Sequence, residues 1–454
     1  MKTVALHTLG CKLNYSETST IAKQFSDKGF EIQEFGTPSD FFVLNTCSVT
    51  ENADRECRQI VRSVIRDNPA TYVIVTGCYA QLQPDEIAKI DGVDLVLGAN
   101  EKFKLFDHLE NSALNDPGKN LSCIGEASVF RSDISDVKDF VGAFTADNDS
   151  RTRAFLKIQD GCNYKCSFCT IPLARGKSRS LDLTGVIENA KKIIDSGYKE
   201  IILTGVNTGD YSHEEKKLID VLHELEKLPI ERIRISSIEP NLLTDEIISL
   251  AASSEKFCDH FHIPLQSGDN EILSQMRRRY RSEFYSELIY KINEKIPDVG
   301  IGVDVIVGFP GETDEHFNST YSFLNSLPIS YLHTFSYSER RDTHAITLPG
   351  SVEIRKRKLR SSMLRNLSEK KKSEFYKRFI GTEQSVLFES KKDNGFHEGY
   401  TSNYIRVKMN SETDIENKII NVSLEAADGT KPVLAIPVEK ENEIILMDKT
   451  LSGY

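Results

Sequence analysis

Residues 160–170 read DGCNYKCSFCT and bring Cys162, Cys166 and Cys169 into one short segment. Three thiolates at CxxxCxxC spacing can hold a single iron-sulfur cube, and one of its four irons then has no protein ligand. That open iron would accept an external ligand, which a structural zinc site closed by four ligands does not offer. The alternatives are three unrelated core cysteines or an incidental zinc loop, and the tight spacing disfavours both.

Six apolar segments separated by helical stretches predict a full or partial βα barrel around this motif. The motif follows the first segment, and barrel active sites lie at the C-terminal ends of the strands. The segments are AFLKIQD (154–160), EIILTGV (200–206), RIRISSI (232–238), HFHIPLQ (260–266), GIGVDVIVG (300–308) and YLHTFSYS (331–338).

Residues 1–112 show a second alternation of strands and helices, with a helix expected from Ser16 and an Arg-rich helix from Thr50. Cys11, Cys47 and Cys78 each follow a different apolar strand. In a parallel sheet the C-terminal strand ends share one edge, so we expect these thiols to converge and to suffice for a second cube. Buried structural cysteines at strand ends are the alternative. Cys57, Cys123 and Cys258 lack partners at useful spacing, so we expect them to be structural.

The remaining segments complete the expected domain organisation. Polar residues 113–150 predict a linker, residues 151–380 the barrel core, and residues 381–446 a small antiparallel β-barrel. Residues 351–380 hold 11 Lys and Arg against 3 Glu, although the whole chain carries 57 basic against 68 acidic residues, a net charge of -11. A phosphate-binding surface and a solvated amphipathic helix fit this basic segment equally well on charge alone.

Length and cysteine usage bound the class of protein. A chain of 454 residues predicts two or three domains, and nine cysteines, an odd number, argue against a disulfide framework. The sequence shows neither a secretion signal nor an apolar run of the ~18 residues that a membrane span needs. We therefore expect a soluble, cytoplasmic protein.

CxxxCxxC on six βα units resembles the radical S-adenosylmethionine (SAM) superfamily, whose open iron chelates the amino and carboxylate groups of SAM. The resemblance implies a SAM pocket at the ends of the later strands, with Phe168 beside the adenine. Gly205 and Gly308 would admit close approach of the ligand, and Ser236 and Gln266 would supply hydrogen bonds. The residues expected to bind SAM are Phe168, Thr204, Gly205, Asn207, Ser236, Glu239, Gln266, Ser267, Val307 and Gly308.

The three regions together resemble the methylthiotransferases over essentially the whole chain. In that family the C-terminal barrel is the RNA-binding TRAM domain. The strings LGCKLNYSET, SSIEP and HIPLQSG are most similar to the branch that acts on N6-threonylcarbamoyladenosine (t6A) next to the anticodon of transfer RNA. The fold expected is α/β, with a parallel-sheet domain, a partial (β/α)6 barrel and a TRAM-like barrel. One departure is that the usual YSxRxGT reads YSERRDT, with Asp342 in place of Gly.

The resemblance implies a tRNA-modifying enzyme with two 4Fe-4S clusters, held by Cys11, Cys47 and Cys78 and by Cys162, Cys166 and Cys169. SAM would be both radical source and methyl donor, and the first of these clusters would supply sulfur to C2 of the adenine. The partners implied are the anticodon stem-loop of tRNA and a flavodoxin or ferredoxin-type electron donor, with no membrane or DNA.

RNA contacts are expected from basic and aromatic residues. Arg277, Arg278, Arg279, Arg281 and Lys356 would bind phosphates, while Tyr400, Asn403 and Tyr404 would stack on bases or hydrogen-bond to them. A carboxylate such as that of the threonylcarbamoyl group favours an Arg, for which Arg340 and Arg341 are the candidates.

Three alternatives remain open. An enzyme of the isopentenyladenosine branch would need a hydrophobic pocket for its prenyl group. A ribosomal-protein methylthiotransferase would act on an aspartate side chain. A non-catalytic iron-sulfur RNA sensor would bind RNA without consuming SAM.

Overall fold

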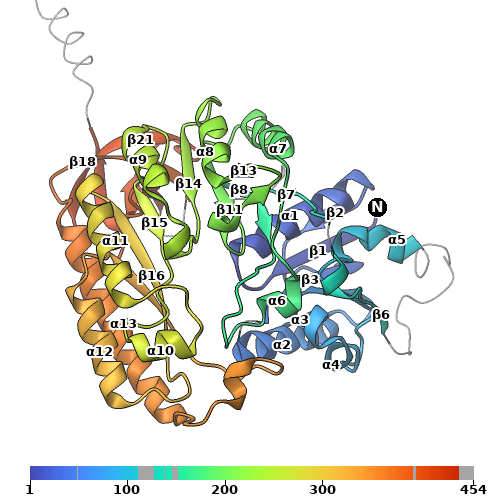
Figure 1. Cartoon of the computed structure of the whole chain (residues 1–454). Coiled ribbons are helices and arrows are strands. Elements are labelled where there is room, and N and C mark those ends of the chain that lie inside the picture. Colours follow the sequence, from blue (N-terminus) through green and yellow to red (C-terminus); the bar gives the residue numbers. More distant parts are fainter. Residues whose placement is uncertain (49, 111–126, 138, 146–151, 392–394, 439–454) are drawn as a thin grey trace, which may run out of the picture.

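The computed structural model describes residues 1–48, 50–110, 127–137, 139–145, 152–391 and 395–438. An N-terminal α/β domain, a central barrel-like domain and a small C-terminal β-barrel lie side by side (Figure 1). In the part of the chain so described, no helix has the length and apolar character to cross a membrane.

The N-terminal domain is a parallel sheet in the order β2-β1-β3-β4-β5-β6. Strands β3 and β4 are buried along their whole length because helices cover both faces of the sheet, as their continuous apolar sequences predict. The first helix begins directly after Cys11, earlier than the start expected at Ser16. The elements are β1 (Thr3–Thr8), α1 (Lys12–Asp27), β2 (Glu31–Gln33), β3 (Phe41–Thr46), α2 (Glu51–Asp67), β4 (Tyr72–Gly77), α3 (Cys78–Leu82), α4 (Pro84–Ala88), β5 (Leu95–Leu97), α5 (Leu105–Glu110) and β6 (Ser128–Phe130).

The central domain confirms the six predicted strands. Together with β7 they form two sheets, β14-β11-β8-β7 and β15-β16-β17, and isolated bridges such as Ile233 to Phe257 and Ser237 to His262 join the sheets into a partial barrel. The strands are β7 (Ala143–Phe144), β8 (Arg153–Lys157), β9 (Gln159–Asp160), β10 (Arg179–Ser180), β11 (Glu200–Thr204), β12 (Ser212–His213), β13 (Lys216–Lys217), β14 (Arg232–Ile235), β15 (His260–His262), β16 (Gly300–Val307) and β17 (Tyr331–Ser336). The helices are α6 (Ile171–Arg175), α7 (Leu183–Asp195), α8 (Leu218–Glu226), α9 (Asp245–Ser253), α10 (Asn270–Gln275), α11 (Ser282–Lys295), α12 (Asp314–Ser326) and α13 (Ile354–Lys377).

Side chains alternate between the barrel core and the barrel lumen along the last three strands. On β16, Val303 and Val305 are buried in the helix-covered core, whereas Asp304 between them is partly exposed. On the edge strand β17, Leu332 is buried while His333 and Phe335 are exposed. This period of two places polar and aromatic residues of β15, β16 and β17 on one lumen wall.

The segment expected to be a linker, residues 113–150, also contributes to both sheets. Its described part contains β6, which pairs with β5, and β7, which pairs antiparallel with β8. The polar composition of this segment concealed both strands, because each is only two or three residues long. Residues 111–126, including Cys123, and residues 146–151 lie outside the described part of the chain.

The C-terminal domain is a closed barrel in the order β18-β19-β20-β22-β21, as its β-rich composition predicted. The segment GYTSNYIRVKM forms parts of two strands, because a turn at 402–405 separates β19 from β20. Residues 392–394 and the end of the expected domain beyond 438 lie outside the described residues. The strands are β18 (Glu383–Lys391), β19 (Phe396–Thr401), β20 (Arg406–Asn410), β21 (Ile419–Ala426) and β22 (Val433–Pro437).

Candidate active site

The loop that carries Cys162, Cys166 and Cys169 leaves the barrel after β9 and ends where α6 begins. Backbone N–H groups donate to two of its sulfurs, from Tyr164 to Cys162 at 3.4 Å and from Ile171 to Cys169 at 3.5 Å. Burial, with a smaller contribution from Cys166, raises the pKa of Cys162 to about 11 and that of Cys169 to about 12. The three thiols therefore lie within electrostatic reach of one another, and ligation of iron must release their protons.

Arg278 lies against this loop. Its Nη1 donates to Cys166 Sγ at 3.2 Å, and its Nη2 pairs with the carboxylate of Glu239. The Arg278 side chain is only 3% exposed. This placement corrects the expectation that Arg278 binds RNA phosphate, because the guanidinium is buried and already has two partners.

The N-terminal cysteines meet at the C-terminal edge of the sheet. Cys47 and Cys78 follow directly on the neighbouring strands β3 and β4, and Cys11 lies between β1 and α1. A side chain at Gly10 would collide with Cys47, since its Cβ would lie 2.9 Å from Cys47 Sγ. Cys11 also raises the pKa of Cys78, after the larger effect of burial. The fold thus brings together three cysteines that are far apart in sequence.

The other two described cysteines are isolated. Cys57 and Cys258 are buried, and burial raises the pKa of Cys57 to about 12 and that of Cys258 to about 11. Burial and the raised pKa make both thiols poor nucleophiles, which agrees with a structural role.

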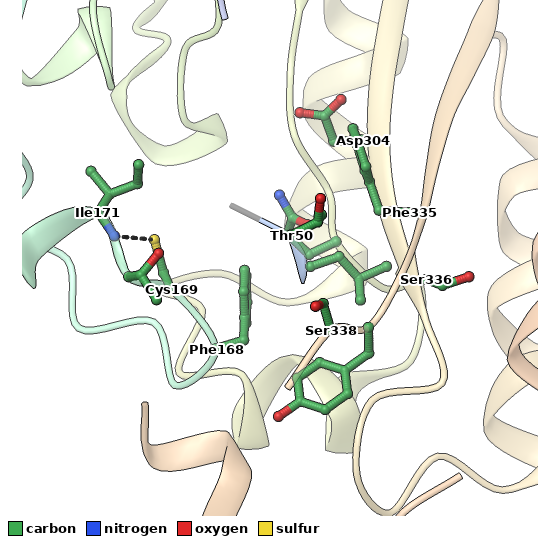
Figure 2. Close-up of a pocket in the computed structure, with 12 residues that line it drawn as sticks. Thr50, Phe168, Cys169, Ile171, Asp304, Phe335, Ser336 and Ser338 are labelled. Atoms are coloured by element: carbon green, nitrogen blue, oxygen red, sulfur yellow. Dashed lines mark hydrogen bonds between the residues drawn. The ribbon is translucent and has the colours of Figure 1, made fainter. Parts of the chain in front are cut away.

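A pocket at the mouth of the barrel connects the two cysteine-bearing domains (Figure 2). The cluster loop contributes Phe168 and Cys169, the N-terminal domain contributes Thr50, and the facing barrel wall contributes Asp304 and Phe335. In Figure 2, Asp304 and Phe335 lie on one side of the pocket and Phe168 and Cys169 on the other. The full lining is Thr50, Phe168, Cys169, Thr170, Ile171, Gln266, Asp304, Ile306, Phe335, Ser336, Tyr337 and Ser338.

Among the residues expected to bind SAM, Asn207 has a side-chain hydrogen-bond donor that no described residue accepts from. Its Nδ2 is buried with no hydrogen-bond partner in the described residues, although its backbone N–H donates to Gln159. A buried unpaired amide is costly, so a ligand with an acceptor group would stabilise it. Gln266 lines the pocket in a left-handed conformation, with φ of 75°. Thr204 and Ser236 are buried at the ends of their strands, and Val307 belongs to the core.

Other expected SAM ligands are occupied by the protein itself. Ser267 Oγ lies 3.1 Å from Thr320 Oγ1, and Glu239 pairs with Arg278. The two glycines were expected to make room for a ligand. A Cβ at Gly205 would instead lie 3.0 Å from Gln159 Oε1, and one at Gly308 would collide with Arg357 at 2.2 Å. Close packing within the chain therefore accounts for both glycines.

The residues expected to contact RNA divide into exposed and buried groups. Arg277, Arg279, Arg281, Arg341 and Lys356 are exposed. Arg279 stacks on Tyr164 of the cluster loop, with 3.8 Å between the guanidinium carbon and the ring centroid. Arg277, Arg279 and Arg281 thus follow α10 at the rim of the barrel mouth.

Arg340 was expected to bind a substrate carboxylate. It is buried, and its Nη2 lies 2.6 Å from both Asp54 Oδ2 and Ser48 Oγ of the N-terminal domain. Its Nη2 joins two domains, whereas its buried Nε has no hydrogen-bond partner in the described residues, and the side chain lines a polar pocket together with Arg341 and Asp342. Arg341 is exposed and pairs with Glu86 at 3.1 Å.

The C-terminal candidates lie at a domain interface, which corrects the expectation of an exposed RNA-stacking surface. Tyr404 stacks on His260 of the barrel with 4.6 Å between centroids, and Tyr400 stacks on Tyr404 at 4.8 Å. Asn403 is buried, donating from Nδ2 to the carbonyl of Asp298 at 3.1 Å. The composition of this segment fitted RNA binding equally well, because aromatic and amide side chains also serve domain interfaces.

Several arginines of the basic helix α13 form ion pairs with carboxylates of the same chain. Arg357 pairs with Glu339 at 2.5 Å, and Arg360 pairs with Glu312 at 2.5 Å and with Asp314 at 2.7 Å. Lys356 also pairs with Asp314, at 2.9 Å, but remains exposed. The local positive charge counted from sequence is therefore partly neutralised by carboxylates from other segments.

Sequence reasoning missed a group of three residues on the lumen wall, His262, Asp304 and His333, whose ligand atoms lie within 4.8 Å of one another. They come from three different strands, so no local motif joins them. The sequence signal that could have found these three residues is a polar side chain, within each apolar strand, at a position that faces the lumen.

Comparison with known proteins agrees with this architecture. The sequence profile of the radical SAM superfamily matches residues 156–324, and that of uncharacterized protein family UPF0004 matches residues 3–98. The threonylcarbamoyladenosine tRNA methylthiotransferase of Bacillus subtilis is 39% identical over 93% of this chain and 94% of its own. A tRNA-2-methylthio-N6-dimethylallyladenosine synthase of Endomicrobium trichonymphae is 30% identical over 93% of this chain and 97% of its own.

A solved structure supports the fold alone. The radical SAM methyltransferase TsrM from Kitasatospora setae, with cobalamin and a 4Fe-4S cluster bound, superposes with a TM-score of 0.53 at 15% identity and covers 76% of this chain and 77% of its own.

Proposed function

Because the chain belongs to the methylthiotransferase family of radical SAM enzymes, we propose that it converts t6A beside the anticodon of tRNA to the 2-methylthio derivative. Membership in this family implies SAM and two 4Fe-4S clusters. The observation that carries the substrate assignment is 39% identity, over almost the full length of both chains, to an enzyme named for t6A, against 30% to one named for the dimethylallyl compound.

Each cysteine triplet would hold one cluster. Cys162, Cys166 and Cys169 are the ligands proposed for the cluster that binds SAM, and Cys11, Cys47 and Cys78 are those proposed for the auxiliary cluster. The chemistry of the donor set supports both, because three thiolates satisfy three irons of a cube and leave one open. The need for two open irons explains why each domain offers three cysteines.

The SAM-binding residues would be those that keep free polar groups near the cluster loop. The unpaired Nδ2 of Asn207 supports a ligand with an acceptor at that point. Phe168, which lines the pocket, offers an aromatic face beside an adenine. Gln266 and Ser236 remain candidates, whereas Ser267 and Glu239 would act by supporting the surrounding loops.

Bound SAM and the two clusters would supply hydrogen-atom abstraction at adenine C2 and a methylated sulfur, chemistry that amino-acid side chains do not provide. The contribution of the chain is to bind, orient and exclude water. The apolar part of the pocket, Phe168, Ile171, Ile306 and Phe335, would enclose a base and keep solvent from the reacting carbon.

The target base must leave the anticodon stack to reach the barrel mouth, which costs a few kcal/mol and is easiest in a loop. Arg277, Arg279 and Arg281 at the rim, with Arg341 and Lys356, are the exposed cations that would hold RNA phosphates. We further propose a flavodoxin or ferredoxin-type electron donor and, because the substrate is tRNA, a cytoplasmic location.

The test is mass spectrometry of nucleosides after tRNA carrying t6A is incubated anaerobically with reconstituted enzyme, SAM and a reductant. A gain of one methylthio group on t6A supports the proposal. SAM cleavage without that product, followed by methylthiolation of isopentenyladenosine tRNA or of the ribosomal protein, would replace it. Absence of SAM cleavage by the cluster-loaded protein would favour the RNA sensor.

A further inference from the structure

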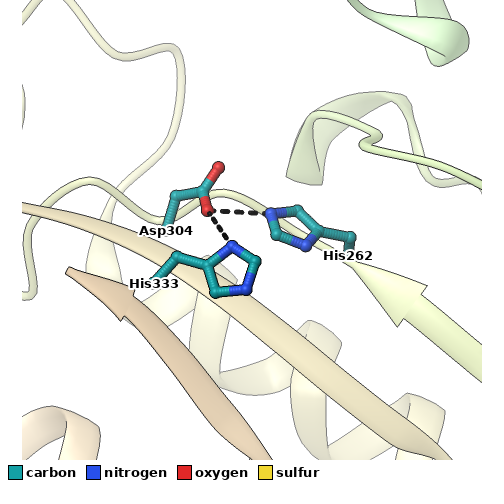
Figure 3. Close-up of side chains that lie close together, drawn as sticks. All are labelled: His262, Asp304 and His333. Atoms are coloured by element: carbon teal, nitrogen blue, oxygen red, sulfur yellow. Dashed lines mark ion pairs between the residues drawn. The ribbon is translucent and has the colours of Figure 1, made fainter. Parts of the chain in front are cut away.

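The lumen wall opposite the cluster loop carries a compact polar group made of His262, Asp304 and His333 (Figure 3). His262 Nε2 lies 2.9 Å from Asp304 Oδ1, and His333 Nδ1 lies 3.5 Å from the same oxygen. The two imidazole centroids are 5.2 Å apart. Asp304 Oδ1 is thus the partner of both imidazole rings, which come from β15 and β17 on either side of β16.

This group is contiguous with the active-site pocket. Asp304 lines the pocket, and Phe335, which also lines it, is two residues from His333 on β17 and shares its face. The His333 side chain is 51% exposed, so its ring is accessible. The cluster loop extends from the first strand of the barrel, β8, whereas His333 lies on its last strand, β17. A base bound between the two would meet the cluster on one side and this polar group on the other.

The chemistry of the group suits a polar ligand. Burial by itself would raise the pKa of Asp304, but His262 and His333 hold it below the ordinary value. Asp304 therefore stays ionised and accepts from both rings, which leaves His262 Nδ1 and His333 Nε2 to face other partners.

The target nucleoside offers matching groups. The substituent on N6 of t6A contains a carboxylate, a hydroxyl and a urea-type N–H, and it projects away from C2. If C2 faces the clusters, the substituent must extend toward another wall of the pocket. The wall that carries His262, Asp304 and His333 is the one opposite the cluster loop.

We propose that His262, Asp304 and His333 recognise the N6 substituent of the target adenosine, with the imidazole nitrogens that do not donate to Asp304 accepting from its hydroxyl and N–H groups. This inference rests on the proposed function and deepens it. Asp304 is a positioning residue that orients the two rings, and His333, the more exposed ring, makes the main contact. A prenyl substituent would offer these groups no hydrogen-bond partner, so the same wall would discriminate against the dimethylallyl substrate.

The test compares wild type, H333A and D304N in the cluster-loaded enzyme with two anticodon stem-loops, identical except that one carries t6A and the other unmodified adenosine. Affinity is measured with SAM present and no reductant. We expect H333A to weaken binding of the t6A stem-loop about three- to tenfold, the effect of losing one neutral hydrogen bond, and to leave binding of the unmodified stem-loop unchanged. D304N should reduce the same preference, because His333 loses its orienting partner.

Controls separate this inference from loss of fold and from failure of the proposed function. H223A, which replaces an exposed histidine on α8, should leave both affinities unchanged. SAM cleavage in the absence of RNA should be equal in wild type and H223A, and H333A should keep the iron content of the wild type. If the wild-type enzyme forms no 2-methylthio-t6A, the proposed function fails; if it forms the product and H333A keeps the full preference for t6A, only the present inference fails.

The ligand atoms also lie close enough for one divalent cation. Elemental analysis of wild type, H262A and H333A for zinc and manganese addresses this outcome. A stoichiometric divalent metal in wild type that is lost in both variants would overturn direct reading by the imidazoles and assign the group to metal binding. Equal weakening of both stem-loops by H333A would likewise overturn a role specific to the substituent.

Discussion

Arg175 forms a bidentate ion pair with Glu17: Nη1 lies 2.9 Å from Oε1 and Nη2 lies 3.1 Å from Oε2. Glu17 belongs to α1, which begins after Cys11, and Arg175 ends α6, which begins shortly after Cys169. Both side chains are almost fully buried. This bidentate pair therefore connects the helices that follow the two cysteine clusters and fixes the orientation of one domain on the other.

The first prediction concerns this connection. R175M should lower the free energy of unfolding by about 3–5 kcal/mol, because it leaves Glu17 buried opposite Lys102 and Lys157 in a network built for three cations. Anaerobic chemical denaturation measures the loss. The exposed pair of Lys199 and Glu231, 2.7 Å apart, is the matched control, and K199A should cost at most about 1 kcal/mol. Equal losses in R175M and K199A would contradict the assigned role.

The second prediction is a pH dependence. Burial alone would raise the pKa of Glu17, but Arg175, Lys102 and Lys157 lower it well below its ordinary value of 4.5. The stability contributed by ionised Glu17 is present in full above that value and is lost as pH falls below it toward the folded pKa. Between pH 5 and pH 3 the wild type should lose stability more steeply than E17Q, by up to about 1.4 kcal/mol per pH unit. Parallel slopes in denaturation curves would exclude this contribution.

The third prediction tests the cluster ligands by iron content. Anaerobic reconstitution should load about eight irons per chain, and about four in either triple Cys-to-Ala variant, if each triplet holds one cube. The double variant C57A/C258A is the control, because both thiols are buried and neither belongs to a triplet, and it should retain all the iron. Full loading of the Cys11, Cys47 and Cys78 triple variant would remove the auxiliary cluster from this domain.

The fourth prediction concerns Arg278, which donates to Cys166 Sγ at 3.2 Å. Hydrogen bonds and positive charge at a ligand sulfur favour the reduced cluster, so R278M should shift its reduction potential to a more negative value. A potentiometric titration followed by electron paramagnetic resonance measures the shift, and SAM cleavage should slow when the reductant is weak. R279M, an exposed neighbour stacked on Tyr164, is the matched control. An unchanged potential in R278M would show that this contact does not tune the cluster.

The fifth prediction follows from the departure at Asp342, whose φ of 63° lies in the left-handed region. Gly adopts this conformation freely, whereas Asp tolerates it at some cost. D342G should therefore be neutral or raise the melting temperature slightly, and the β-branched D342V should lower stability by about 1–2 kcal/mol. Thermal unfolding measures both. Destabilisation by D342G would mean that the carboxylate makes a contact worth more than the strain.

The basic segment at residues 351–380 differs from what its charge alone suggested. Its composition predicted a phosphate-binding surface or a solvated helix. In the structure Arg357 and Arg360 are buried, and they pair with Glu339, which follows β17, and Glu312, which follows β16. A count of charges cannot show which cations already have partners, because the partners come from distant parts of the chain.

The sequence by itself determined the longer strands and the domain types, and it singled out both cysteine triplets. Apolar periodicity reports local structure, and the chemistry of iron restricts its ligands to few residue types, so both signals are readable without coordinates. Only the tertiary structure decided which polar residues meet. Glu17 and Arg175 are 158 positions apart, and His262, Asp304 and His333 lie on three separate strands. Their pairing depends on how domains pack and on which face of each strand lines the lumen, and no local pattern in the chain records either.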